Sequence, residues 1–234
     1  MLFNLKQKTN LAPTEIFGIR VKVSARAKRM SLRVEARSGE IVLTWPKRGA
    51  SQNAALRFID ENKGWIATQR ATLVKTKTIS SGGTISILGR AYDIEHRTGR
   101  GLTRIEDNKI IVFGAPEHTS RRVRDFIKKQ AAIVLAARTA EKCKKLNLKP
   151  SPVRIIDPKT RWGSCAPDGR IMFSWRLMLS PDNVLDYVVA HEVAHLVHMN
   201  HSRKFWALCL TLCQDGVASR RWLKKNGAEL MAYR

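Results

Sequence analysis

The chain of 234 residues lacks the features that place a protein in a membrane or in an oxidising compartment. No stretch approaches the roughly 20 apolar residues of a membrane-spanning helix, and the first residues do not form the apolar core of about 7–15 residues that marks a signal peptide. The four cysteines, Cys143, Cys165, Cys209 and Cys213, form no CxxC pair and fit a reducing compartment. The sequence therefore predicts a soluble, cytoplasmic protein without a membrane partner.

Acidic residues are also scarce, with 19 Asp and Glu against 43 Lys and Arg, a net charge of +24 and a pI near 10.7. Residues 1–115 hold 21 basic and 9 acidic side chains, and residues 116–234 hold 22 and 10, so the excess is not confined to a tail. Such a surface attracts polyanions in a salt-dependent way. Nucleic acid is therefore a candidate partner, although a basic surface without a dedicated ligand explains the charge equally well.

A metal-binding pattern stands out among the residues that are present: HEVAH at residues 191–195, followed by His201. On a helix of ~100° per residue, His191 and His195 lie ~40° apart around the axis and one turn apart along it. Both rings can then reach one Zn²⁺ at ~2.0–2.1 Å, while Glu192 lies beside the metal and suits a general base. We predict a zinc metallopeptidase with one Zn²⁺ per chain, which hydrolyses protein or peptide substrates with a metal-activated water.

The third ligand is less closely determined by spacing than the first two. A helix capped by Ser180 is expected to end near residues 199–200, which leaves His201 in the turn before a helix capped by Ser202. His198 competes because it lies on the same helical face as His195, but three ligands on adjacent positions of one straight helix would crowd a tetrahedral ion. We therefore favour His201. If Cys165 or His198 closed the coordination as a fourth ligand, the zinc would be structural and the protein a non-catalytic module.

The rest of the chain predicts an α+β fold with two domains, residues 1–115 and 116–234. The first domain is β-rich around one helix, from Ser51 to about Leu73. Its expected strands are 18–24, 29–36, 40–45, 85–88, 92–95, 103–105 and 110–113, of which the last four form a meander. The second domain begins with a long helix from Thr119 or Ser120 to about Leu146. Its expected strands are 153–156, 159–165 and 171–179, and the metal-binding helix and closing helices follow.

The chain resembles the YgjP-like metallopeptidases, a family related to the SprT-like and WLM zinc proteases. The matching segments are TRWGSC at 160–165, YVVAHEVAHL at 187–196, NHSRKFW at 200–206, KRMSLRV at 28–34 and ILGRAY at 87–92. The resemblance implies a gluzincin-like, compact zincin-like peptidase domain behind an N-terminal β-rich region. It also implies that His191, His195 and His201 bind zinc and that Glu192 is the base. Kinship to SprT-like enzymes suggests, as an alternative, a protease that acts on proteins bound to nucleic acid.

The segment 161–165 is the candidate for substrate binding, because peptidases bind extended substrates at an exposed sheet edge near the metal. Trp162 is expected to wall the cleft, and Arg161 to hold a carbonyl or carboxylate group. The alternative is that Trp162 and Cys165 are core residues under the metal-binding helix and that Gly163 permits close approach. The sequence identifies no oxyanion-stabilising residue.

Overall fold

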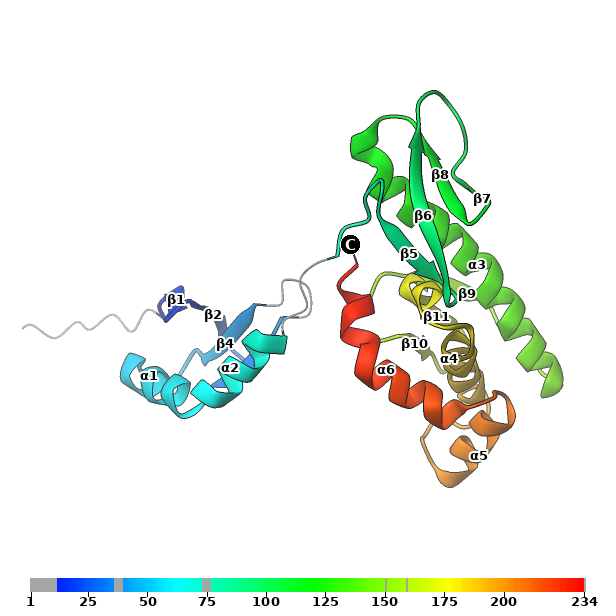
Figure 1. Ribbon diagram of the computed structural model, residues 1–234. Coiled ribbons are helices and arrows are strands. Elements are labelled where there is room, and N and C mark those ends of the chain that lie inside the picture. The colour runs from blue at the N-terminus through cyan, green and yellow to red at the C-terminus, as the bar shows by residue number, and fades with distance from the viewer. Residues whose placement is uncertain (1–11, 36–39, 73–76, 150, 159, 234) are drawn as a thin grey trace, which may run out of the picture. The chain divides into compact units, whose positions relative to one another are not determined.

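The computed structural model describes residues 12–35, 40–72, 77–149, 151–158 and 160–233 (Figure 1). Its contacts divide the chain into two compact units, Met1–Lys75 and Thr76–Arg234. Within the described residues, no helix is long and apolar enough to cross a membrane. The first residues of the chain, on which the signal-peptide prediction was made, lie outside the described part.

The first unit is a four-stranded sheet with two helices. The strands are β1 (Glu15–Ile16), β2 (Ile19–Ser24), β3 (Ser31–Val34) and β4 (Ile41–Pro46), in the order β1-β2-β4-β3, and α1 (Gln52–Glu61) and α2 (Lys63–Thr72) follow. Ser51 caps α1 as predicted, because its Oγ accepts the Ala54 N–H at 3.3 Å. The predicted single helix is interrupted at Asn62, whose side-chain amide donates to the Phe58 carbonyl at 2.7 Å. This bond replaces one that a continuous helix would make with the backbone.

The second unit begins with another four-stranded sheet, and its strand order corrects the predicted meander. The strands are β5 (Thr84–Ile87), β6 (Arg90–Arg97), β7 (Arg104–Glu106) and β8 (Lys109–Phe113), in the order β5-β6-β8-β7. β8 pairs with β6 in parallel, and its Ile110, Ile111 and Val112 are fully buried. β7 is therefore displaced to the edge, where it forms a hairpin with β8 through the left-handed residues Asp107 and Asn108.

The two sheets share one topology. In each, a hairpin is followed by a parallel pairing and a second antiparallel pairing, and a helix comes next along the chain. Both first hairpins turn through two left-handed residues, Phe17-Gly18 and Leu88-Gly89. The surroundings of the two turns differ: Phe17 is 72 % exposed, whereas Leu88 packs against the core and its N–H donates to the Met178 carbonyl at 2.8 Å.

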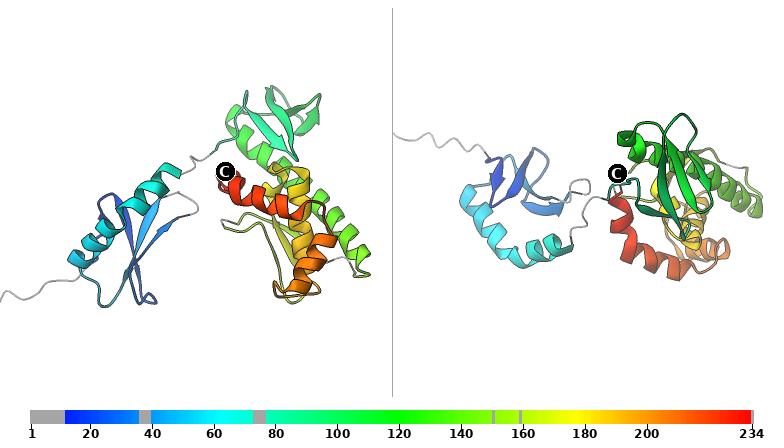
Figure 2. Two further views of the ribbon diagram at one scale, coloured as in Figure 1. Left: turned by 60° about the horizontal axis from the view of Figure 1, so that its bottom comes forward. Right: turned by 45° about the horizontal axis from the view of Figure 1, so that its top comes forward.

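A long helix, α3, follows the second sheet and packs against several elements of the second unit (Figures 1 and 2). The short 3₁₀ helix η1 (Pro116–His118) leads into α3 (Thr119–Lys145), which has the predicted extent. Val123 and Ile127 of α3 belong to the same buried core as Ile110 and Val112 of β8. The structure therefore divides the chain at residues 75–76, and the sheet that the predicted boundary at 115–116 assigns to the first domain belongs to the compact unit of α3.

The remaining elements contain the HEVAH segment and complete an α+β fold, as predicted. β9 (Val153–Ile156), β10 (Gly163–Cys165) and β11 (Ile171–Ser174) form a sheet of order β10-β11-β9. The 3₁₀ helix η2 (Trp175–Leu179), α4 (Asp182–Ala194), α5 (Arg203–Thr211) and α6 (Gly216–Met231) follow. The predicted strand 171–179 ends at Ser174, whose Oγ accepts the Arg176 N–H at 3.3 Å. All five residues of η2 are buried, so the inside–outside alternation of a strand does not apply to them.

Candidate metal centre

The helix α4 contains His191, and His195 is the residue that caps its C-terminus. It begins at Asp182, because the Ser180 hydroxyl donates to the Leu177 carbonyl at 2.7 Å instead of capping α4. It ends at Ala194, five residues earlier than predicted. There the backbone N–H groups of Leu196 and Val197 donate to carbonyls three residues earlier, as in a 3₁₀ turn. His191 and His195 still lie one turn apart, with ring centres separated by 5.0 Å.

His201 reaches both of these rings from the loop that follows α4. Its ring centre lies 5.0 Å from that of His191 and 4.8 Å from that of His195. The Nε2 atoms of His191 and His201 are 3.1 Å apart, and one nitrogen from each of the three rings lies within 4.8 Å of the others. Nitrogens bound tetrahedrally at ~2.0–2.1 Å lie roughly 3.3–3.4 Å apart. The three rings therefore fit a divalent metal such as zinc.

The surroundings orient the rings. His195 Nδ1 lies 3.0 Å from the His198 carbonyl, so the proton belongs on Nδ1 and the Nε2 lone pair is available for a metal. Phe205 of α5 packs against all three rings, at 4.5–4.9 Å between ring centres. Trp206 lies 5.6 Å from His201 at an interplanar angle of 28°.

Burial favours the neutral form of His191 and His195. Burial, aided by the neighbouring histidines and Arg220, lowers the pKa of His191 to about 4, and burial lowers the pKa of His195. Both rings are then neutral at neutral pH, which is the form that binds metals.

Glu192 is buried beside the cluster, with 6 % of its surface exposed. Burial raises the pKa of its carboxyl to about 7, against which the charge of Arg161 acts in the lowering direction. A Cβ atom on Gly163 would lie 2.6 Å from Glu192 Oε1. The edge strand β10 therefore passes directly against this carboxylate, and only glycine leaves room for it.

The other predicted site residues lie in different surroundings. Arg161 is exposed, whereas Trp162 is half-buried and packs against Gly227 of α6. Burial raises the pKa of Cys165 to about 11, so it is a neutral thiol. Neither Cys165 nor His198 belongs to the cluster of donor atoms found among the described residues.

Three contributions to the site were not recognised from the sequence: the packing of Phe205, the stacking of Trp206 on His201, and Arg220. The guanidinium carbon of Arg220 lies 4.9 Å from the centre of the Trp206 ring. The segment that contains Phe205 and Trp206 was part of the family resemblance but carried no assigned role. Arg220 had no signal in the sequence, because α6 approaches the site only through the fold.

Comparison with known proteins identifies the chain. The family described as YgjP-like, metallopeptidase domain, matches residues 28–226. Comparisons with curated proteins and with solved structures each gave no significant match. The match covers most of the chain and contains the histidine cluster, Glu192 and β10. The chain belongs to the YgjP-like metallopeptidase family.

Proposed function

We propose that the protein is a zinc-dependent peptidase in which His191, His195 and His201 bind one Zn²⁺ and Glu192 is the general base. The observation that carries the proposal is the convergence of three imidazole nitrogens within 4.8 Å, next to a buried carboxylate. The substrate is a protein or a peptide.

The residues divide the chemistry between them. A bound Zn²⁺ would polarise the substrate carbonyl and lower the pKa of a coordinated water. Glu192 takes the proton from the attacking water and returns it to the leaving amine. Its raised pKa, about 7 by burial, suits a group that accepts and donates a proton near neutral pH. Phe205 packs against all three rings and restricts their orientation.

An extended substrate is proposed to pair with β10. This strand is at the edge of its sheet and approaches Glu192 at Gly163, so a peptide added there would lie beside the metal. Arg161 precedes β10, is exposed and acts electrostatically on Glu192. We assign Arg161 the role of binding a carbonyl or carboxylate group of the substrate. Trp162 packs on α6, and we assign it to supporting the strand.

A structural zinc is the less favoured assignment. Structural sites are closed by four protein ligands, and the cluster among the described residues has three. The candidates for a fourth ligand, Cys165 and His198, lie outside this cluster, and the Cys165 thiol donates to the Ala166 carbonyl at 3.6 Å.

The test compares wild type with Glu192→Gln. We expect one zinc per chain in both proteins by metal analysis, cleavage of a proteome-derived peptide library by wild type only, and loss of that cleavage on chelation. His198→Ala is the matched control and should keep both metal and cleavage. Full activity of Glu192→Gln with bound metal would remove Glu192 from the mechanism.

The charge supports a second candidate function, a peptidase that acts on proteins bound to nucleic acid. Residues 1–75 carry 15 basic and 5 acidic side chains, and the second unit is basic as well. Titration against duplex and single-stranded DNA at two salt concentrations tests this function. An affinity no higher than that of an unrelated protein of equal charge would refute it.

A further inference from the structure

We propose that Arg220 is a specificity-determining residue that binds a carboxylate group of the peptide substrate beside the metal centre. The inference rests on the proposed function, because it names the substrate class of that same site. It makes the enzyme selective for acidic side chains or for a free C-terminus near the scissile bond.

The start of α6 is held firmly against α4. A Cβ atom on Gly216 would lie 2.7 Å from Leu210 Cδ2 and 3.4 Å from the Tyr187 ring, so the two helices approach closely there. One turn later, the Ser219 hydroxyl donates to the Asn183 carbonyl at 3.2 Å. Arg220 directly follows this anchored turn, so its backbone position relative to α4 is well determined.

The Arg220 guanidinium lies close to the candidate metal centre. It lies 4.9 Å from the Trp206 ring centre, and that ring lies 5.6 Å from the ring centre of His201. The guanidinium carbon is therefore within about 10.5 Å of the His201 ring. An extended peptide advances ~3.3–3.6 Å per residue, so a carboxylate on Arg220 would belong to a residue within about three positions of the scissile bond.

Arg220 differs from the other cationic side chains that lie over aromatic rings, because it has no acidic partner among the described residues. Lys77, Arg104 and Arg176 also lie over aromatic rings, and each is ion-paired, with Glu229, Glu106 and Asp157 respectively. Arg220 has no ion pair or hydrogen bond with any residue in the part of the chain that the structure describes. It is also exposed.

Stacking prepares Arg220 for a carboxylate. A guanidinium whose carbon lies over an aromatic ring keeps N–H groups that can donate two parallel bonds to a carboxylate. Because the indole restricts the side chain before binding, less conformational entropy is lost when the ion pair forms. Arg161 adds positive charge beside Glu192, so the surroundings of the cluster favour anionic substrate groups.

The experiment measures binding separately from turnover. Fluorescein-labelled ten-residue peptides are titrated by anisotropy against zinc-loaded Glu192→Gln protein, with and without Arg220→Gln. One neutral peptide has an amidated C-terminus, a second differs only in its free C-terminal carboxylate, and a third set is amidated with one Glu moved along the sequence. Wild type and Arg220→Gln then cleave the same peptides.

We expect the Glu192→Gln protein to bind at least one acidic peptide about tenfold more tightly than the neutral one, and Arg220→Gln to remove this preference. If Arg220→Gln loses the preference for the internal Glu, Arg220 binds a side-chain carboxylate. If it loses the preference for the free C-terminus, Arg220 binds the terminal carboxylate. Arg221→Gln, the neighbouring exposed arginine, is the matched control and should keep the preference.

The experiment distinguishes failure of the role of Arg220 from failure of the proposed function. If wild type cleaves the peptides but Arg220→Gln weakens binding of neutral and acidic peptides equally, or not at all, the role of Arg220 is refuted and the proposed function stands. If zinc-loaded wild type cleaves no peptide, the proposed function fails. Circular dichroism of Arg220→Gln verifies that the fold is retained.

Discussion

Gly163 links the fold to the proposed chemistry, because strand β10 passes against the Glu192 carboxylate at this residue. In Gly163→Ala the new methyl group would lie 2.6 Å from Glu192 Oε1 and 2.7 Å from its Cγ, so the carboxylate must move. We expect peptide cleavage to fall about 10- to 100-fold, because a displacement of about 1 Å in a catalytic group has effects of this size. Zinc content, measured on the same samples, should be unchanged.

Gly64→Ala is the matched control for this substitution. A Cβ atom there meets nothing within 4 Å, and alanine is favoured over glycine in a helix. This variant should keep wild-type cleavage and metal content. A Gly163→Ala protein as active as Gly64→Ala would show that β10 does not constrain Glu192.

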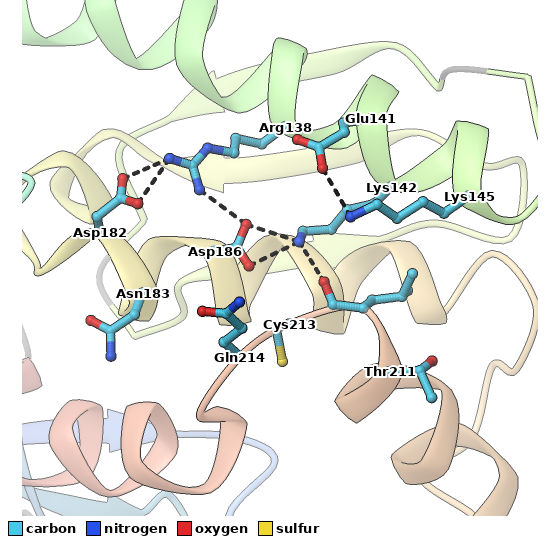
Figure 3. A pocket seen from close by; sticks show the side chains of 11 residues that line it. Arg138, Glu141, Lys142, Lys145, Asp182, Asn183, Asp186, Thr211, Cys213 and Gln214 are labelled. Carbon is cyan, nitrogen blue, oxygen red and sulfur yellow. Dashed lines mark hydrogen bonds and ion pairs between the residues drawn. The ribbon is translucent and has the colours of Figure 1, made fainter.

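At the scale of elements, an ion-pair cluster ties α3 to α4 on a face that does not contain the histidine cluster (Figure 3). Lys142 of α3 is 3 % exposed, and its ammonium donates to Asp186 of α4 at 2.8–2.9 Å and to the Leu212 carbonyl at 2.6 Å. Arg138 bonds to Asp182 and Asp186. The cluster holds α4 against α3.

We predict that Asp186→Ala lowers the free energy of unfolding by about 3 kcal/mol, because it leaves the buried Lys142 ammonium without a carboxylate. Urea denaturation measures the loss. Asp125→Ala removes the exposed Arg121–Asp125 pair, also on α3, and should cost less than about 1 kcal/mol. Equal losses in the two variants would contradict a structural role for the cluster.

The two related hairpin turns give a second prediction about elements. Phe17 and Leu88 both have left-handed backbones, which asparagine tolerates, but only Leu88 packs against a core. Leu88→Asn should therefore lower the free energy of unfolding by about 1–2 kcal/mol, and Phe17→Asn should change it by less than about 0.5 kcal/mol. Urea titration of each variant measures both values, and the reverse order would refute this account of the turns.

For the whole molecule, the compact units predict which fragments fold. A fragment of residues 77–234 keeps the second sheet, α3 and the histidine cluster together. It should melt cooperatively and bind zinc. A fragment of residues 116–234 loses β5–β8 and exposes Val123 and Ile127, which are fully buried in the intact chain.

We expect the shorter fragment to show no cooperative transition, because too much apolar surface of α3 becomes exposed to water. Thermal melting followed by circular dichroism, together with metal analysis, compares the two fragments. Cooperative melting of residues 116–234 at the same temperature as residues 77–234 would support the boundary predicted at 115–116.

The sequence predicted local features well. Ser51, Ser202 and the extent of α3 were found because caps and helical periodicity depend on neighbouring residues. Some failed predictions reflect local side-chain bonds that compete with the helix, as at Asn62 and Ser180, and others depend on distant contacts. The order β5-β6-β8-β7 is set by which strand is buried, and the 3₁₀ helix η2 by burial on all sides.

The same distinction holds at the metal centre. The sequence by itself determined that His191, His195 and His201 can converge, because an i,i+4 spacing and a six-residue turn are local geometry. Only the tertiary structure decided that Gly163 lies against Glu192 and that Arg220 stacks on Trp206. These approaches join segments that are distant along the chain, and their positions follow from packing summed over the whole core, which no local pattern encodes.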